Sequence, residues 1–263
     1  MFPCLAALGL AALALTLAGC SDHQKRTWQP RSAEENYRIA LEAEHADERR
    51  DAVARIAESG YYRQEDAFHV LDVVARTDEA PQIRCIAVRS LARYNDERPV
   101  KTLLLILQAT RGSGDALPAN DDLRCETATA LAGLLRKGVV DEPVRDLTRD
   151  IFIKLAESDS SRNVRIVAIE ALAEFREPQV LQPLIRSLRH EDFGIVDRAE
   201  RSLIALTGET HFHDADLWEQ WAAATSEPFA RAGQSPAVSQ PAGPSWWDRQ
   251  TRAWRRGLKL APD

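Results

Sequence analysis

The chain has 263 residues, of which 44% are hydrophobic and 28% are charged, so it can bury the core of one or two ordinary domains and is not disordered overall. Its formal net charge of −6 excludes a general nucleic-acid binder, because such proteins normally carry a broad basic surface. No apolar run reaches the length of about 20 residues that a membrane-spanning helix needs.

The N-terminal residues predict an exported, lipid-anchored protein. An apolar run from Leu5 to Gly19 has the length of the central region of a secretion signal. It ends in Leu17-Ala18-Gly19-Cys20, which resembles the lipobox of bacterial lipoproteins. The resemblance implies that residues 1–19 are cleaved off and that the thiol of Cys20 is acylated, which tethers the protein to a membrane of the bacterial cell envelope, facing the periplasm. The resemblance also implies a preference for the outer membrane, because Ser21 rather than an aspartate directly follows the cysteine. The alternative is an ordinary cleaved signal whose following cysteine carries no lipid.

The body of the chain repeats one pattern, in which an apolar residue and an arginine are followed by a small residue and then by a further apolar residue. The pattern is clear at Ile83-Arg84, Leu123-Arg124 and Val164-Arg165, and weaker at Glu48-Arg49 and Ile195-Val196. The copies recur every 30 to 40 residues or so, a period that is typical of helical solenoids.

Each copy is preceded by a second amphipathic stretch, so the repeat unit is predicted to be two antiparallel helices. These stretches lie at 68–74, 103–107, 151–155 and 180–188. Helix starts are marked by a capping box at Ser32-Ala33-Glu34-Glu35 and by three prolines that each follow an acidic residue within two positions, Pro99, Pro143 and Pro178. Alternating strand patterns are absent. We therefore expect an all-α repeat domain of about five helix pairs over residues 33–224, preceded by a polar spacer at 20–32.

Two segments connect the pattern to a known family. Asp78-Glu79-Ala80-Pro81-Gln82-Ile83-Arg84 and Asp159-Ser160-Ser161-Arg162-Asn163-Val164-Arg165 resemble the Asp-x-x-x-x-Val-Arg signature of HEAT repeats, in particular the bacterial HEAT-like class known from phycobilisome lyases. The resemblance implies an α-solenoid.

The signature residues are expected to connect neighbouring repeats. The aspartate can cap the second helix of its repeat, and the arginine can bond toward the aspartate or carbonyls of a neighbouring repeat. We interpret these residues as a structural ladder: Asp78, Arg84, Arg124, Asp159 and Arg165. The alternative is a row of arginines that binds a ligand.

Two cysteines of the body, Cys85 and Cys125, each follow the repeat arginine. Equivalent residues of stacked repeats lie about 9 to 11 Å apart, which exceeds the limit of about 7 Å between the Cα atoms of a disulfide. We therefore expect half-buried thiols, with a disulfide as the alternative.

A closing segment follows the last repeat and resembles the Leu-Thr-Gly end of many bacterial HEAT-repeat proteins. Gly208 is expected to end a helix, Asp214 to cap the next one, and Trp218 with Trp221 to cover the open end of the core. His211-Phe212-His213-Asp214 also contains metal-ligand types, but no third ligand element is present, so a capping loop is the preferred interpretation.

No catalytic or cofactor motif is present. The chain lacks a glycine-rich phosphate loop, a Gly-x-Ser-x-Gly elbow and a His-Glu-x-x-His motif, so we expect neither an enzyme nor a bound cofactor. The acidic pairs at 65–66, 121–122 and 191–192 are expected at helix starts, where they favour the helix dipole.

The C-terminal residues differ from the body. Residues 225–245 are rich in Pro, Ser and Ala and predict an extended linker. Residues 246–263 have a charge of +3 and are expected to form a short basic helix, in which Trp247, Trp254 and Leu258 share one side. Docking on the acidic repeats, binding to an anionic membrane or envelope polymer, and disorder remain open for this tail. Its candidate binding residues are Trp246, Trp247, Arg252, Trp254, Arg255 and Arg256.

The expected function is that of a membrane-anchored scaffold that binds another envelope protein, because stacked helices offer a long rigid face without a catalytic centre. The first alternative is a lyase-like protein that handles a cofactor such as a tetrapyrrole. The second is a protein that binds membrane or peptidoglycan through its basic tail.

Overall fold

A computed structural model describes residues 31–110, 114–142 and 144–236. The chain divides into two compact units, an N-terminal unit of residues 1–90 and a C-terminal unit that begins at Leu91. In the described residues all regular structure is helical, with eleven α-helices, one short 3-10 helix and no strand. The prediction of an all-α fold is confirmed.

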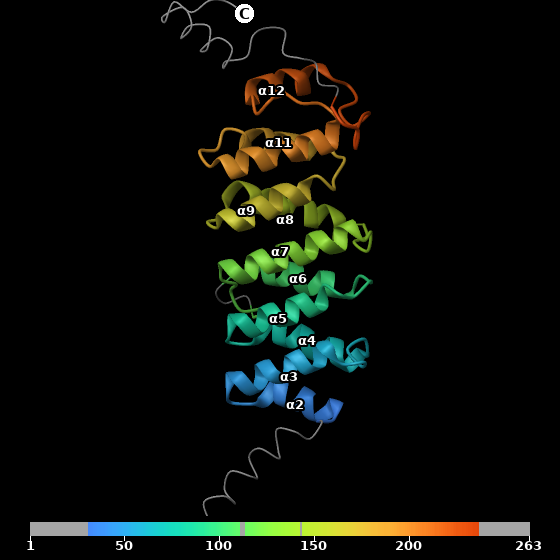
Figure 1. Ribbon diagram of the computed structural model, residues 1–263, viewed down its shortest axis with the longest axis vertical. Coiled ribbons are helices and arrows are strands. Elements are labelled where there is room, and N and C mark those ends of the chain that lie inside the picture. The colour runs from blue at the N-terminus through green and yellow to red at the C-terminus, as the bar shows by residue number, and fades with distance from the viewer. Residues whose placement is uncertain (1–30, 111–113, 143, 237–263) are drawn as a thin grey trace, which may run out of the picture. The chain divides into compact units, whose positions relative to one another are not determined.

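The N-terminal unit contains two helix pairs (Figure 1). The first pair is α2 (Ala33–Glu42) with α3 (Ala46–Glu58), and the second is α4 (Glu65–Thr77) with α5 (Pro81–Leu91), which ends at the boundary of the unit. Helix α2 packs against both α3 and α4. Ile56, Leu71 and Ile83 lie fully inside this core.

The C-terminal unit contains three further pairs and a closing helix, stacked in chain order in Figure 1. Helices α7, α9 and α11 contact one another in sequence and form one layer, while α8, α10 and α12 form the other. Antiparallel pairs stacked in this way are the arrangement of an α-solenoid. The helices are α6 (Arg98–Gln108), α7 (Asp121–Arg136), α8 (Val144–Ser158), α9 (Arg162–Leu172), the 3-10 helix η1 (Pro178–Val180), α10 (Leu181–Ser187), α11 (Phe193–Thr207) and α12 (Ala215–Ala224).

The small residue of the repeat pattern explains how closely the helices pack. It is fully buried in all five copies, and a larger side chain there would push the helices apart. The five alanines are Ala52, Ala87, Ala128, Ala168 and Ala199.

Helix ends follow the local chemistry of the sequence. The Ser32 hydroxyl accepts a hydrogen bond from the Glu35 N–H, as the predicted capping box requires. Asp214 accepts bonds from two N–H groups of the first turn of α12. Gly208 has a left-handed φ of 71° and ends α11.

The expected linker begins later than residue 225. Residues 228–234 form turns that return to α11, where the Gly233 N–H donates to the Ala205 carbonyl at 2.9 Å. Gly208 permits this approach, because a Cβ atom at that position would lie 2.5 Å from the Arg231 carbonyl oxygen. Arg231 also donates to Glu209. A tertiary contact therefore folds the start of a segment whose composition indicates an extended chain.

The predicted signal at 1–19, Cys20 and the tail at 246–263 lie outside the described residues. Among the residues that are described, no helix combines the length and hydrophobicity needed to cross a bilayer. Cys85 and Cys125 are not joined by a disulfide in this part of the chain, and Cys85 is buried while Cys125 is partly buried.

Candidate interaction surface

Three of the predicted ladder residues, Asp78, Arg124 and Asp159, take part in two matching contacts, one in each unit, and Arg49, which was not predicted as a ladder residue, supplies the arginine of the first. Arg49 on α3 donates to both carboxylate oxygens of Asp78, at 2.8 and 3.1 Å. Arg124 on α7 does the same to Asp159, at 2.9 and 2.8 Å. Each contact joins the second helix of one pair to the turn inside the following pair.

The aspartates of the ladder have a second role, which differs from the expected one. One oxygen of Asp78 accepts from the Ala80 N–H and one oxygen of Asp159 accepts from the Ser161 N–H, both at 2.8 Å. These N–H groups lie before the first turn of the second helix, so the aspartates hold the turn between the helices rather than capping the helix itself.

The other two ladder arginines turn back toward their own repeat. Arg84 is 2% exposed, and its Nε donates to the Ala75 carbonyl. Its burial lowers the pKa of the guanidinium. Arg165 donates to the Ala156 carbonyl in the same way, and it also contacts the ring of His190 at 3.1 Å.

The guanidinium donors of Arg49 and Arg124 are occupied within the fold. The remaining nitrogen of Arg49 donates to the carbonyls of Ala43 and Glu44, and that of Arg124 donates to the Ala119 carbonyl. Donors used in this way are not available to a ligand. The geometry therefore favours the structural interpretation of these two residues over a ligand-binding row.

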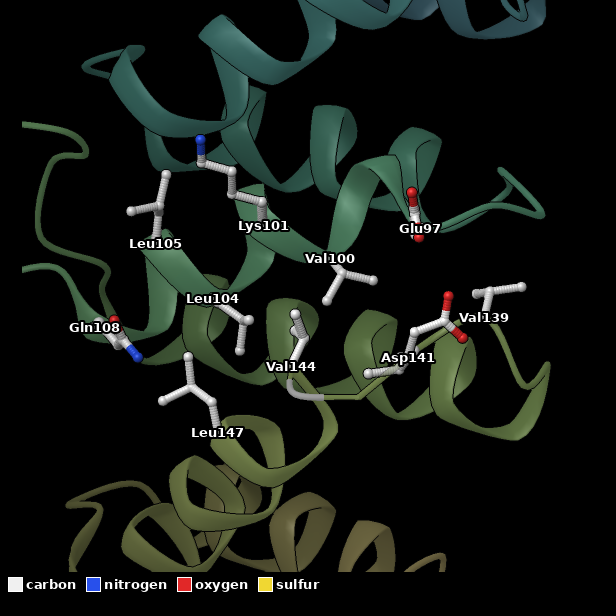
Figure 2. Close-up of a pocket in the computed structure, with 11 residues that line it drawn as sticks. Glu97, Val100, Lys101, Leu104, Leu105, Gln108, Val139, Asp141, Val144 and Leu147 are labelled. Carbon is white, nitrogen blue, oxygen red and sulfur yellow. The ribbon is translucent and has the colours of Figure 1, made fainter.

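An apolar groove in the C-terminal unit is the best candidate for an interaction surface. It lies between α6 and the start of α8, has a volume of about 350 Å³, and is shown in Figure 2. From α6 and the residue before it, the groove is lined by Glu97, Val100, Lys101, Leu104, Leu105 and Gln108. From the α7–α8 connection and α8, it is lined by Val139, Val140, Asp141, Val144 and Leu147.

Apolar side chains meet in the middle of the groove. Figure 2 shows Val100 and Leu104 facing Val144 and Leu147 across the gap. The two side chains of α6 are buried, whereas Val144 is 37% exposed and Leu147 is 45% exposed. Large apolar side chains exposed beside a groove are typical of a binding surface.

Two carboxylates stand at one end of the groove. Glu97 and Asp141 are both exposed and are drawn on the same side of the groove in Figure 2, while Lys101 and Leu105 are drawn on the opposite side. Within the residues that the structure describes, neither carboxylate forms an ion pair, although the adjacent acids do: Asp96 pairs with Arg98 and Glu142 pairs with Arg145. The groove therefore combines an apolar floor with negative charge at one end.

The groove was not predicted from the sequence. One available signal was the run Leu103-Leu104-Leu105-Ile106-Leu107. Five consecutive apolar residues point to more sides of a helix than the single apolar face that packs on a core. Leu103 and Ile106 fill the core, so part of the run remains for the groove. The other signal was Leu147, an apolar residue on the outer side of α8.

The closing segment is built around a buried carboxylate. Glu200 is 4% exposed and accepts hydrogen bonds from the Thr210 hydroxyl, from the N–H groups of His211 and His213, and from the Trp218 indole. These bonds tie α11 to the loop and to α12.

The two histidines of this loop face aromatic neighbours. The ring of His211 packs edge-on against Trp218, and that of His213 lies 5.6 Å from the ring of Phe193. No group of three or more metal-ligating side chains is found among the described residues. The loop itself packs against the closing helix through the His211 and Trp218 rings.

Comparison with known families supports the repeat assignment. The family model for HEAT repeats matches residues 114–204, which include α7, α8, α9, α10 and most of α11. No curated protein matches the chain. The matched segment carries the Arg124–Asp159 contact and the buried alanines of three repeats. Residues 114–204 are therefore similar to HEAT repeats, in agreement with the stacked helix pairs of this part of the chain.

Proposed function

We propose that the chain is a lipid-anchored scaffold of the bacterial cell envelope that binds a partner protein through the α6–α8 groove. The observation that carries the proposal is the exposure of Val144 and Leu147 beside two carboxylates that lack ion-pair partners in the described residues. HEAT repeats supply rigid helices on which such a surface keeps its shape. The lipobox-like sequence ending in Cys20 supports the anchor.

The chemistry of the groove indicates what kind of partner segment it binds. A volume of about 350 Å³ is small for a ligand pocket, so it accommodates one or two large side chains rather than a whole helix. The carboxylates of Glu97 and Asp141 favour lysine or arginine next to those side chains. The expected partner segment therefore carries an apolar anchor flanked by basic residues, on the face of a helix or an extended strand.

A matched pair of substitutions tests the groove. Leu147→Asp places a charge in the groove, and Leu217→Asp places the same charge on α12, where Leu217 is 46% exposed and lies outside the groove. Both proteins are produced at full length in bacteria that process lipoproteins, crosslinked in cells and analysed by mass spectrometry.

We expect the crosslinked envelope partner to be lost from the Leu147→Asp protein and kept by the Leu217→Asp protein. If both variants keep the partner, or if both lose it, the groove is not its binding site and the proposal fails.

The anchor has its own test. Cys20→Ala removes the only thiol at the predicted cleavage site, and Cys4→Ala removes a thiol inside the predicted signal. We expect the wild-type and Cys4→Ala proteins to incorporate a labelled fatty acid and to sediment with membranes, and the Cys20→Ala protein to do neither. Labelling that survives Cys20→Ala would contradict the proposed anchor.

A further inference from the structure

The α6–α8 groove has a suitable occupant in the chain itself. We propose that the basic, tryptophan-rich tail at residues 246–263 docks into this groove, with Trp254 and Leu258 as apolar anchors. The tail lies outside the described residues, so the inference rests on its sequence, on the groove and on the chain length that joins them. Docking of the tail does not require that the groove also binds a partner protein.

The chemistry of the two surfaces matches. The groove has an apolar middle, and the carboxylates of Glu97 and Asp141 stand at one end (Figure 2). In the tail, Trp254 and Leu258 are four residues apart and would share one face of the helix that the sequence predicts, and Arg255 and Arg256 directly follow the tryptophan. A tryptophan supplies a large apolar surface for a small site, while the guanidinium groups pair well with carboxylates.

The tail and the rest of the chain have net charges of opposite sign, so they attract each other. Residues 246–263 carry five basic and two acidic side chains, so the acidic balance of the chain resides in the rest of it. A basic segment joined to an acidic domain has a high effective concentration at that domain, so even a weak contact is well populated.

The chain between the last described residue and the tail is long enough to reach the groove. The described residues end at Pro236, shortly after the turn that Gly233 fastens to α11. Helices α12, α10 and α8 are successive neighbours in one layer, so the groove lies about three helix spacings away, or roughly 30 Å. The residues between Pro236 and Trp254 can extend to roughly 55 Å.

Docking of the tail would give the scaffold a built-in competitor. A partner that uses the same groove must displace the tail, so the apparent affinity for that partner falls with the fraction of chains whose groove is filled. Neutralising the tail arginines would then increase partner binding.

A photocrosslinking experiment on the full-length, membrane-bound protein tests the docking. Trp254 is replaced by the photoreactive aromatic residue p-benzoylphenylalanine, which keeps an apolar ring at the anchor position. After irradiation, peptide mapping by mass spectrometry locates the attachment point. We expect crosslinks within one chain, to residues 97–108 or 139–147.

Variants of the groove make the result specific. Leu147→Asp is expected to reduce the crosslink yield about tenfold, which corresponds to 1.4 kcal/mol, and Leu217→Asp is expected to leave it unchanged. The double variant Glu97→Gln, Asp141→Asn alters only exposed side chains, so it tests the charge contribution without disturbing the core, and we expect it to reduce the yield as well.

Other attachment points overturn the proposal. Crosslinks to lipid indicate a membrane-bound tail, crosslinks to another protein indicate a partner, and crosslinks between two copies indicate exchange between chains. The absence of crosslinks to the groove, or an unchanged yield in both groove variants, also overturns it.

The outcome can be separated from that of the proposed function. Partner capture is repeated in a chain in which Arg252, Arg255 and Arg256 are replaced by glutamine. A partner captured in this chain, together with absent tail crosslinks, supports the scaffold and rejects the docking. Tail crosslinks in the wild-type chain, together with no partner in either chain, support the docking and reject the scaffold.

Discussion

The indole N–H of Trp218 donates a hydrogen bond of 2.6 Å to Glu200, and both side chains are buried. A buried carboxylate is stable only when its oxygens are satisfied, and here four donors converge on it. The bond fastens α12 over the end of the core, so the closing helix is held by a specific polar contact in addition to apolar packing.

Trp218→Phe tests the strength of this contact. The substitution keeps an apolar ring and removes the donor, and we expect it to lower the free energy of unfolding by about 1.5 to 3 kcal/mol, the range for hydrogen bonds to charged groups. Trp221→Phe is the control, since Trp221 is partly exposed and packs against the Trp218 ring through an edge contact. Urea unfolding followed by circular dichroism measures both. Equal losses would mean that ring packing, rather than the hydrogen bond, holds the cap.

The contact between Arg124 and Asp159 is expected to couple two neighbouring repeats. In a double-mutant cycle with Arg124→Ala and Asp159→Ala, we expect a coupling free energy of about 1 to 3 kcal/mol, because both side chains are largely buried and share two hydrogen bonds. Arg50 and Asp47 form an ion pair whose side chains are 55% and 84% exposed, and their coupling should stay below about 0.5 kcal/mol. Similar coupling free energies for both pairs would show that the contact between Arg124 and Asp159 stabilises the fold no more than an exposed ion pair does.

The contact between Arg124 and Asp159 joins two residues of the local motif that the sequence singles out, whereas Arg49 belongs to a weaker copy of the motif and was not predicted as a ladder residue. Asp159 and Arg165 lie within seven residues, and the motif fixes how each side chain is presented to the next repeat. The partner of Arg165 was not predictable, because it is His190, whereas the partners of Arg49 and Arg124 are the aspartates Asp78 and Asp159.

The groove could not be predicted from the sequence for a different reason. It depends on the separation of α6 and α8, which are more than thirty residues apart, and on the path of the connection at 139–141. Periodicity indicates which residues of a helix face the core, but it does not indicate where two neighbouring helices fail to close the space between them. The turns at 228–234 likewise depend on the close approach of Arg231 to Gly208.

Stability should decrease in acid, and Asp192 should account for part of the decrease. Its pKa is lowered by hydrogen bonds from Arg162 and from the N–H groups of Ile195 and Gly194. A carboxylate with a lowered pKa stabilises the fold at pH values above its unfolded pKa, near 3.9, and this contribution is lost as the pH falls through the folded value. Asp192 also caps α11.

Asp192→Asn separates these two roles, because asparagine caps helices about as well as aspartate but does not titrate. We expect the wild-type melting temperature to fall more steeply than that of the variant as the pH is lowered from 5 to 3. Thermal melts at several pH values measure the difference. Parallel curves would show that the Arg162 contact does not contribute to the pH dependence.

Cys125 should react slowly with alkylating agents. Burial raises the pKa of its thiol, and the carboxylates of Glu126 and Asp122 raise it further. Because the thiolate is the nucleophile, a raised pKa leaves less reactive species at a given pH. We expect iodoacetamide to modify Cys125 several-fold more slowly at pH 8 than a cysteine introduced at Arg136, which is exposed at the end of α7. Mass spectrometry of the Cys125 peptide follows the reaction.

Glu126→Gln and Asp122→Asn should each increase the rate, because they remove a negative charge that disfavours the thiolate. If neither substitution changes the rate while Cys125 remains slow, steric access rather than charge controls its reactivity.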